Sequence, residues 1–103
     1  MEIFLISQQN TRGNEYSPAR LEQNAPNPFN RNTTINYYLP QNANKAMLEI
    51  ISMDGKVIRT YSLAIKGNGQ VTITGGVLAS GTYQYALTID GKLIDSKKMV
   101  ITR

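Results

Sequence analysis

Hydrophobic and polar residues alternate along the chain from Thr33 onward. The stretch TTINYYLP (33–40) has an apolar side chain at every second position and stops at a proline. A period of two puts alternate side chains on the same face of an extended strand. We therefore expect a half-buried strand whose inner face carries Ile35, Tyr37 and Leu39.

The same alternation recurs in the second half of the chain and predicts further strands. It is clearest where Tyr83 and Tyr85 share one face with Leu87 and Ile89, which makes the two tyrosines core residues rather than a sugar-binding platform. No stretch of ten or more residues keeps the 3.6-residue spacing of a helix. The expected strands cover residues 46–52, 57–65, 71–74, 82–89 and 92–103.

Two Asp-Gly pairs lie between alternating runs, at Asp54-Gly55 and at Asp90-Gly91. Asp-Gly is the strongest short hairpin signal, because both of its residues tolerate a positive φ. Each pair is therefore expected to join two neighbouring antiparallel strands by a tight turn.

Two glycine-rich stretches separate the remaining strands. KGNGQ (66–70) is expected to be another turn, and GGVLASG (75–81) is expected to be a loop that tucks Leu78 under the sheet. The pattern amounts to six strands, or seven if residues 20–23 also pair. Short strands at such regular spacing predict an all-β fold, an immunoglobulin-like antiparallel β-sandwich.

The stretch NAPNPFN (24–30) has two prolines on either side of an asparagine. Proline fixes its own φ and forces the preceding residue into an extended or turn conformation, so this backbone is held in place without a ladder of hydrogen bonds. Phe29 follows directly, and its burial would contribute about 1.5 to 3 kcal/mol. We expect this stretch to fasten the start of the domain to the sandwich.

Residues 1–20 differ from the rest of the chain. The apolar run IFLI (3–6) has four residues, whereas a membrane span needs about 20 and the apolar part of a signal peptide about 7 to 15. We therefore expect no export signal or membrane anchor there, and the run would be the last strand of an upstream segment or a cloning remnant. The polar stretch that follows has the composition of a linker. Residues 1–20 are interpreted as a linker or a remnant of an upstream cargo, and residues 21–103 as the domain.

The composition disfavours catalysis. The chain has 103 residues, of which 41% are hydrophobic and 17% charged, and it contains neither cysteine nor histidine. The usual general bases, nucleophiles and zinc ligands are therefore missing, and no disulfide can form. The turns explain Asp54 and Asp90, and the spacing of Asp90 and Asp95 is not that of a calcium loop. We predict that the protein is not an enzyme and holds no metal or cofactor.

The chain is basic, with a formal net charge of +4 and a pI near 9.5. Its eleven lysines and arginines are dispersed, and the longest run of them is Lys97-Lys98. A nucleic-acid-binding surface needs a clustered basic face, so a nucleic-acid partner is not expected. Consecutive strand residues point to opposite faces, so this pair would be either a charged edge that blocks unwanted pairing or part of a recognition element.

Four stretches of the sequence, in order, resemble one known family. The pattern resembles the type A C-terminal sorting domain of the bacterial type IX secretion system, found on exported proteins of the Bacteroidetes group. Its most specific part is PNPFN followed by the alternation TxIxYxLP, and KKMVI at the end of the chain adds to the resemblance. The stretches are LEQNAPNPFNRNTTINYYLP (21–40), LEIISMDGKVI (48–58), LASGTYQYAL (78–87) and DGKLIDSKKMVITR (90–103).

The resemblance implies a non-catalytic, immunoglobulin-like domain that directs an attached cargo through an outer-membrane translocon. The implied partners are the type IX translocon, its outer-membrane shuttle proteins, the upstream cargo domain of the same chain, and a sortase-like peptidase that removes the tail at the cell surface. The cargo would carry an N-terminal export signal, pass through the periplasm and end at the cell surface or outside the cell. No cofactor is implied.

Carried over position by position, the resemblance assigns two sets of residues. The final strand would be captured by the translocon, by addition to a sheet edge of the partner, and a terminal strand also invites self-association by strand pairing. Ser52 departs from the family, because many members have an aspartate there. The expected recognition residues are Lys97, Lys98, Met99, Val100 and Ile101. The other motif residues are Pro26, Asn27, Pro28, Phe29, Asp54, Gly55, Lys56, Gly81, Tyr83 and Tyr85.

A carbohydrate-binding or adhesive β-sandwich module of a secreted protein is the alternative function. It would require exposed aromatic side chains in a planar row, for which Tyr16, Tyr38 and Tyr61 are the candidates. These tyrosines are far apart in the sequence, and the chain has no tryptophan.

Overall fold

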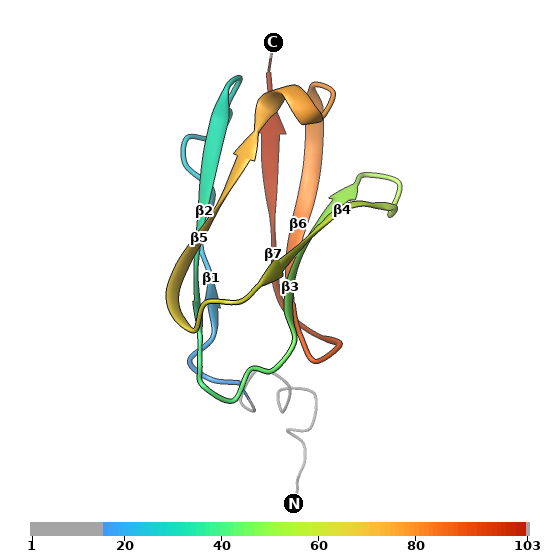
Figure 1. The fold of residues 1–103 in the computed structure, drawn as a ribbon. Helices are drawn as coiled ribbons and strands as arrows, with labels where there is room; N and C mark the ends of the chain where they lie inside the picture. The colour runs from blue at the N-terminus through green and yellow to red at the C-terminus, as the bar shows by residue number, and fades with distance from the viewer. Residues whose placement is uncertain (1–15, 103) are drawn as a thin grey trace, which may run out of the picture.

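The structure is a computed structural model, and it describes residues 16–102. The expected strand or remnant at residues 3–6 and most of the predicted linker lie outside the described residues. The described part contains seven strands (Figure 1). They are β1 (Arg20–Leu21), β2 (Asn32–Leu39), β3 (Ala46–Ser52), β4 (Val57–Leu63), β5 (Gly67–Thr74), β6 (Gly81–Ile89) and β7 (Lys92–Ile101).

The strands form two antiparallel sheets that face each other. One sheet has the order β1-β2-β5 and the other the order β4-β3-β6-β7. The chain changes sheet between β2 and β3, between β4 and β5, and between β5 and β6 (Figure 1). The prediction of an all-β antiparallel sandwich is confirmed, and the short β1 is the optional seventh strand.

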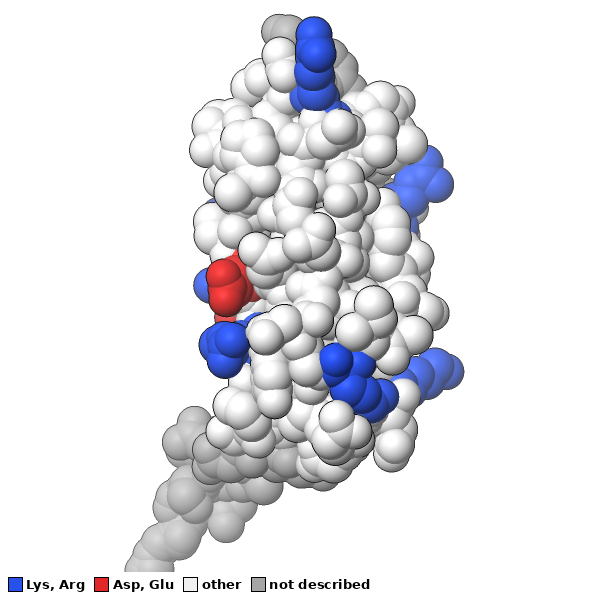
Figure 2. Space-filling view, turned by 60° about the vertical axis from the view of Figure 1, so that its left-hand side comes forward, with Lys and Arg blue, Asp and Glu red and all other residues white. Residues whose placement is uncertain are grey.

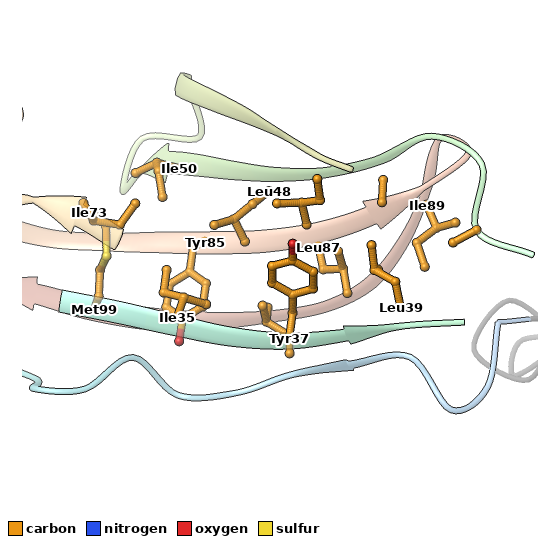
Figure 3. Close-up of a cluster of buried hydrophobic side chains, with 14 of the residues drawn as sticks. Ile35, Tyr37, Leu39, Leu48, Ile50, Ile73, Tyr85, Leu87, Ile89 and Met99 are labelled. Atoms are coloured by element: carbon orange, nitrogen blue, oxygen red, sulfur yellow. The ribbon is translucent and has the colours of Figure 1, made fainter. Parts of the chain in front are cut away.

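The core lies between the two sheets and follows the predicted alternation. Ile35, Tyr37 and Leu39 of β2 point toward the other sheet, where Leu48 and Leu87 lie (Figure 3). Their side chains are buried, while the intervening residues of β2 are exposed or half-buried. The largest fully buried side chains are Tyr85, Ile35, Leu39, Leu48, Ile50, Ile73, Leu87, Ile89, Met99, Ile101 and Thr33.

The two Asp-Gly pairs both form hairpin turns, but of different kinds. Asp90 and Gly91 have φ of 51° and 82°, so both adopt the positive φ that was predicted. At the other turn only Gly55 does so, with φ of 94°. The register of β3 and β4 shifts at this end, so the turn is longer and needs one left-handed residue instead of two.

Strand β5 begins earlier than expected. The sequence predicted a turn at residues 66–70, but Gly67 pairs with Leu39 and Gly69 pairs with Tyr37 in the ladder of β2 and β5. A Cβ atom at Gly69 would lie 2.4 Å from the ring of Tyr37. Glycine is therefore present because the Tyr37 ring lies across this position, and not because the chain turns here.

The segment after β5 matches its prediction. It contains a short 3₁₀ turn, η2 (Gly75–Val77), and the side chain of Leu78 is buried. Among residues 16–102 there is no helix of the length and apolar character needed to cross a membrane.

The two sheets differ in the number of strands, so one edge of the wider sheet is not covered by the narrower one. The three-stranded sheet packs its β1 edge beside β7. The four-stranded sheet extends one strand further on the opposite side, so β4 is its outermost strand. In Figure 1 the β3–β4 hairpin projects sideways from the body of the molecule.

Candidate recognition site at the final strand

Strand β7 places the expected recognition residues on two faces. Met99 and Ile101 are 0% and 2% exposed and belong to the core. Lys98 is exposed and Val100 half-buried on the outer face of the sheet. While the sandwich is intact, a partner can therefore reach Lys98 and Val100 but not Met99 or Ile101.

Lys97 lies on the same side of β7 as Met99, but its side chain is only half-buried. Its Nζ is 3.6 Å from Oδ2 of Asp95, and both side chains are partly exposed. Lys97 and Lys98 thus point to opposite faces, as their adjacency predicted. An exposed ion pair of this kind contributes about 0 to 1 kcal/mol, so it does little to hold the strand.

The outer edge of β7 is covered by residues 23–29, which we call the clasp. The backbone N–H of Val100 donates to Oδ1 of Asn27 at 2.9 Å, and the Gln23 side chain donates to the carbonyl of Lys98 at 2.7 Å. Phe29 exchanges two backbone hydrogen bonds with the strand, donating to Val100 at 3.0 Å and accepting from Thr102 at 2.8 Å. The edge of the final strand is therefore occupied from Lys98 to Thr102.

The composition of the clasp explains how it covers an edge without creating a new one. Pro26 and Pro28 have no backbone N–H to offer to another strand, and both of their peptide bonds are cis. Phe29 is 3% exposed and sits in the core, as predicted. Sequence reasoning missed that the clasp lies on the final strand, because no local pattern encodes a contact across some seventy residues, such as the separation of 73 between Asn27 and Val100.

Tyr85 of β6 ties the start of the clasp and the residue before it to the core. Its hydroxyl accepts a hydrogen bond from the Asn24 backbone N–H at 2.7 Å and donates to the Glu22 carbonyl at 2.8 Å. The side chain is fully buried, and this burial raises the pKa of Tyr85 to about 12. The hydroxyl therefore stays protonated and keeps its donor role.

Asn24 and Thr33 complete the support of the clasp, and sequence reasoning assigned neither a role. The Asn24 side chain donates to Oγ1 of Thr33 at 3.0 Å and to the carbonyl of Pro26 at 3.2 Å. The Thr33 hydroxyl donates to the same carbonyl at 2.8 Å. Both residues are buried, so their polar atoms need these partners. The one available signal was the asparagine directly before the proline-rich stretch.

The remaining motif residues lie at the same end of the sandwich. Gly81 and Tyr83 pair with Ile101 and Met99 of the final strand, and Ser52 pairs with Tyr83 from the other side. The Tyr83 hydroxyl donates to the carbonyl of Ala79 at 2.6 Å, across the loop before β6. The motif therefore surrounds the part of β7 that the clasp covers.

The turn at Asp54, Gly55 and Lys56 follows directly from β3. The Ser52 hydroxyl donates to the carboxylate of Asp54, and this bond lowers the pKa of Asp54. The backbone N–H of Ser52 also donates to the carbonyl of Lys56 at 2.8 Å. The departure from the family pattern at Ser52 thus leaves a closed, hydrogen-bonded turn.

The tyrosines considered for glycan binding do not share a surface. Tyr16 is 5% exposed and donates its hydroxyl to Asp90 at 2.8 Å. Tyr38 faces outward from the three-stranded sheet, with the Arg20 guanidinium 5.2 Å from its ring centre, whereas Tyr61 belongs to β4 and packs against the core. A planar row of these three rings is therefore not formed.

Charged side chains are scattered over the molecular surface. In Figure 2, which brings the side of the three-stranded sheet forward, lysines and arginines stand apart around a mostly uncharged face. This sheet carries a shallow polar hollow of about 310 Å³, lined by Glu22, Asn36, Asn68, Gly69 and Gln70. Within residues 16–102, histidine, cysteine and acidic side chains do not gather in groups of three that could hold a metal ion.

Comparison with known proteins identifies the class. The family model described as secretion system C-terminal sorting domain matches residues 25–102. The chain belongs to this family, and it is a C-terminal secretion signal of the type IX system. Such a domain interacts with the type IX secretion machinery, is attached to an upstream cargo, and directs export to the cell surface or out of the cell. The family is a non-catalytic one.

A solved structure shares the fold. The chain is similar to a structure titled "Biofilm associated protein - BSP domain", with a TM-score of 0.56 and 15% sequence identity over 80% of this chain. The match spans 15% of that longer chain, and the likeness concerns the fold alone. No curated protein sequence matches the chain at a significant level.

Proposed function

We propose that the type IX machinery recognises this domain in its folded state, at the corner where the clasp lies on β7. The domain itself performs no chemistry. Its cargo reaches the periplasm by an N-terminal signal, the translocon and outer-membrane shuttle proteins bind the corner, and a sortase-like peptidase removes the domain at the cell surface.

The observation that supports this proposal is the occupied edge of the final strand. Capture of residues 98–102 by edge addition would first have to remove the clasp. That step breaks five hydrogen bonds, each worth about 0.5 to 1.5 kcal/mol, and exposes Phe29, whose burial contributes about 1.5 to 3 kcal/mol. Recognition of the closed corner needs no such step.

The exposed chemistry of the corner defines what a partner must offer. Lys98 supplies a positive charge, and Val100 supplies a small apolar surface on the same outer face. The exposed rings of Pro26 and Pro28 lie next to them on the clasp. A complementary surface would place an acidic group beside a shallow apolar patch.

The test is export of a periplasmic reporter fused to residues 21–103 in a bacterium with a type IX system. Lys98→Glu reverses the charge at the corner, and we expect it to lower the secreted fraction about fivefold or more, because a like-charge contact with the partner replaces an attractive one. Lys45→Glu is the matched control, with the same charge change on an exposed residue at the opposite end of the sandwich. Equal export of the two variants, both shown to be folded, would overturn the proposal.

A second variant separates recognition of the closed corner from capture of a released strand. Asn27→Ala removes the acceptor of the Val100 N–H and loosens the clasp. If the machinery captured a free strand, loosening would raise export; recognition of the closed corner predicts equal or lower export. Asn30→Ala, at an exposed residue just beyond the clasp, is the control.

A further inference from the structure

The β4 edge is an unusual surface for a small β-domain. β4 is the outermost strand of its sheet, and the narrower three-stranded sheet does not extend over it. In the described part of the chain, nothing pairs with its outer side. Such an edge is a template for another strand, and natural domains normally blunt it with lysine, proline or a covering segment.

Exposed apolar side chains lie along this edge beside its one charged residue, Arg59. Met53 is 57% exposed, Val57 51% and Ile58 38%, and Val77 of η2 is 46% exposed. The Arg59 side chain donates to the carbonyl of Val77 at 3.4 Å, so η2 lies beside the middle of the strand. The sequence of β4, VIRTYSL, contains neither lysine nor proline. By contrast, the clasp covers the end of β7 at the other edge of the sheet.

We propose that β4 binds β4 of a second copy of this chain, as an antiparallel pair about a two-fold axis at Thr60. In this register Thr60 faces Thr60 of the second copy, and Arg59 faces Tyr61. The inner faces of both strands then continue one another, because Arg59 and Tyr61 pair with Ile50 and Leu48 of β3 and so lie on the same, inner face of the sheet. The result is a continuous eight-stranded sheet, twice the four strands of one copy.

The strand is self-complementary in this register. Threonine pairs are favourable across antiparallel strands, and a guanidinium over a tyrosine ring adds a cation–π contact. Centring the pair on Arg59 instead would place two like charges directly opposite each other, which is destabilising.

The positive charge of Arg59 disfavours a basic strand from an unrelated protein as the partner of β4, because like charges opposite each other are destabilising. Arg59 is the one charged residue of β4, and in the proposed register it faces the uncharged Tyr61 of the second copy. A pair of seven-residue strands buries less than a standard interface of about 1,600 Å², so the dimer is weak and depends on concentration.

The test uses the purified full chain without any secretion machinery, so it is independent of the proposed function. Sedimentation velocity over a concentration series should show a monomer–dimer equilibrium. Ile58→Lys should weaken association about tenfold or more, because it places a charge against the facing strand. Leu93→Lys, at a similarly exposed apolar residue of β7, should leave association unchanged.

Single cysteines test the register, because the natural chain has none. Thr60→Cys should form an intermolecular disulfide readily, since opposite Cα atoms lie about 4.5 to 5.5 Å apart. Ser62→Cys is equally exposed, but its symmetric partner would lie about 13 Å away along the strands, so it should cross-link slowly. Urea unfolding of both reduced variants checks that they fold.

Three results would overturn the proposal. One is a monomer at every concentration, and another is a dimer that Ile58→Lys and Leu93→Lys affect equally. The third is equal cross-linking at residues 60 and 62. If β4 instead binds a strand of an unrelated protein, the purified chain will remain a monomer at every concentration, which is the first of these results.

Discussion

Tyr85 joins β6 to the N-terminal segment through a single hydroxyl group. The alternation of the sequence predicted that its ring is buried, but not what its hydroxyl binds. Both partners, Asn24 and Glu22, are more than sixty residues away, with separations of 61 and 63. Burial can be predicted from a local period of two, whereas a contact of this range depends on how the two sheets are stacked. The burial of the Tyr85 ring could therefore be predicted from the sequence, whereas the hydrogen bonds of its hydroxyl to Asn24 and Glu22 could not.

Replacing this hydroxyl should weaken the whole domain. In Tyr85→Phe, the Asn24 N–H and the Glu22 carbonyl lose their partner, and we expect the free energy of unfolding to fall by about 1 to 3 kcal/mol. Tyr38→Phe removes a hydroxyl from a half-buried outward ring and should change it by less than about 0.5 kcal/mol. Urea denaturation of both variants measures the difference. Similar losses would show that the Tyr85 bonds contribute nothing specific.

The same residue predicts an alkaline limit to stability. Burial raises the pKa of Tyr85 from 10.0 to about 12, so the fold favours the neutral phenol. The corresponding contribution is complete below pH 10 and is lost as the pH rises through about 12. The urea midpoint should therefore fall over this range, and Tyr85→Phe should flatten part of that fall. Burial raises the pKa of Tyr37 as well, so some of the slope should persist. An unchanged slope in the variant would contradict the assignment.

At the scale of the elements, most strands could be predicted from the sequence. β2 and β3 follow directly from the alternation, and both Asp-Gly turns are where the sequence placed them. β5 was predicted to begin at residue 71 but begins at Gly67, because a glycine can mark a turn or leave space for a neighbouring ring. Only the cross-strand position of Tyr37 distinguishes the two.

A substitution in β5 tests this explanation. Gly69→Ala would place a Cβ 2.4 Å from the Tyr37 ring, which must then move within a packed core, and we expect a loss of about 1 to 3 kcal/mol. Gly76→Ala is the control, because a Cβ there meets nothing within 4 Å and its φ is not positive. Thermal unfolding compares the two. If Gly69→Ala were as mild as the control, the ring would not be what requires the glycine.

At the scale of the whole molecule, the final strand is both part of the expected recognition site and part of the core. Removing residues 97–103 would take away Met99 and Ile101, which are 0% and 2% exposed, together with the strand on which the clasp lies. We expect the truncated chain to lose cooperative unfolding, measured by circular dichroism in urea. A matched variant, Lys97→Ala with Lys98→Ala, keeps the apolar residues and should unfold cooperatively. A truncated chain that still unfolds in one sharp transition would show that β7 is dispensable for folding.

Because the clasp and its partner strand come from opposite ends of the domain, the fold cannot close until nearly every residue of it has been synthesised. If translation stops early, or if a protease removes the last strand, Phe29 loses its hydrogen-bond partners Val100 and Thr102, and the contact between the clasp and β7 does not form. The folded sorting domain would then be present only on chains whose translation has passed residue 102. Incomplete cargo proteins would lack it and would not be exported.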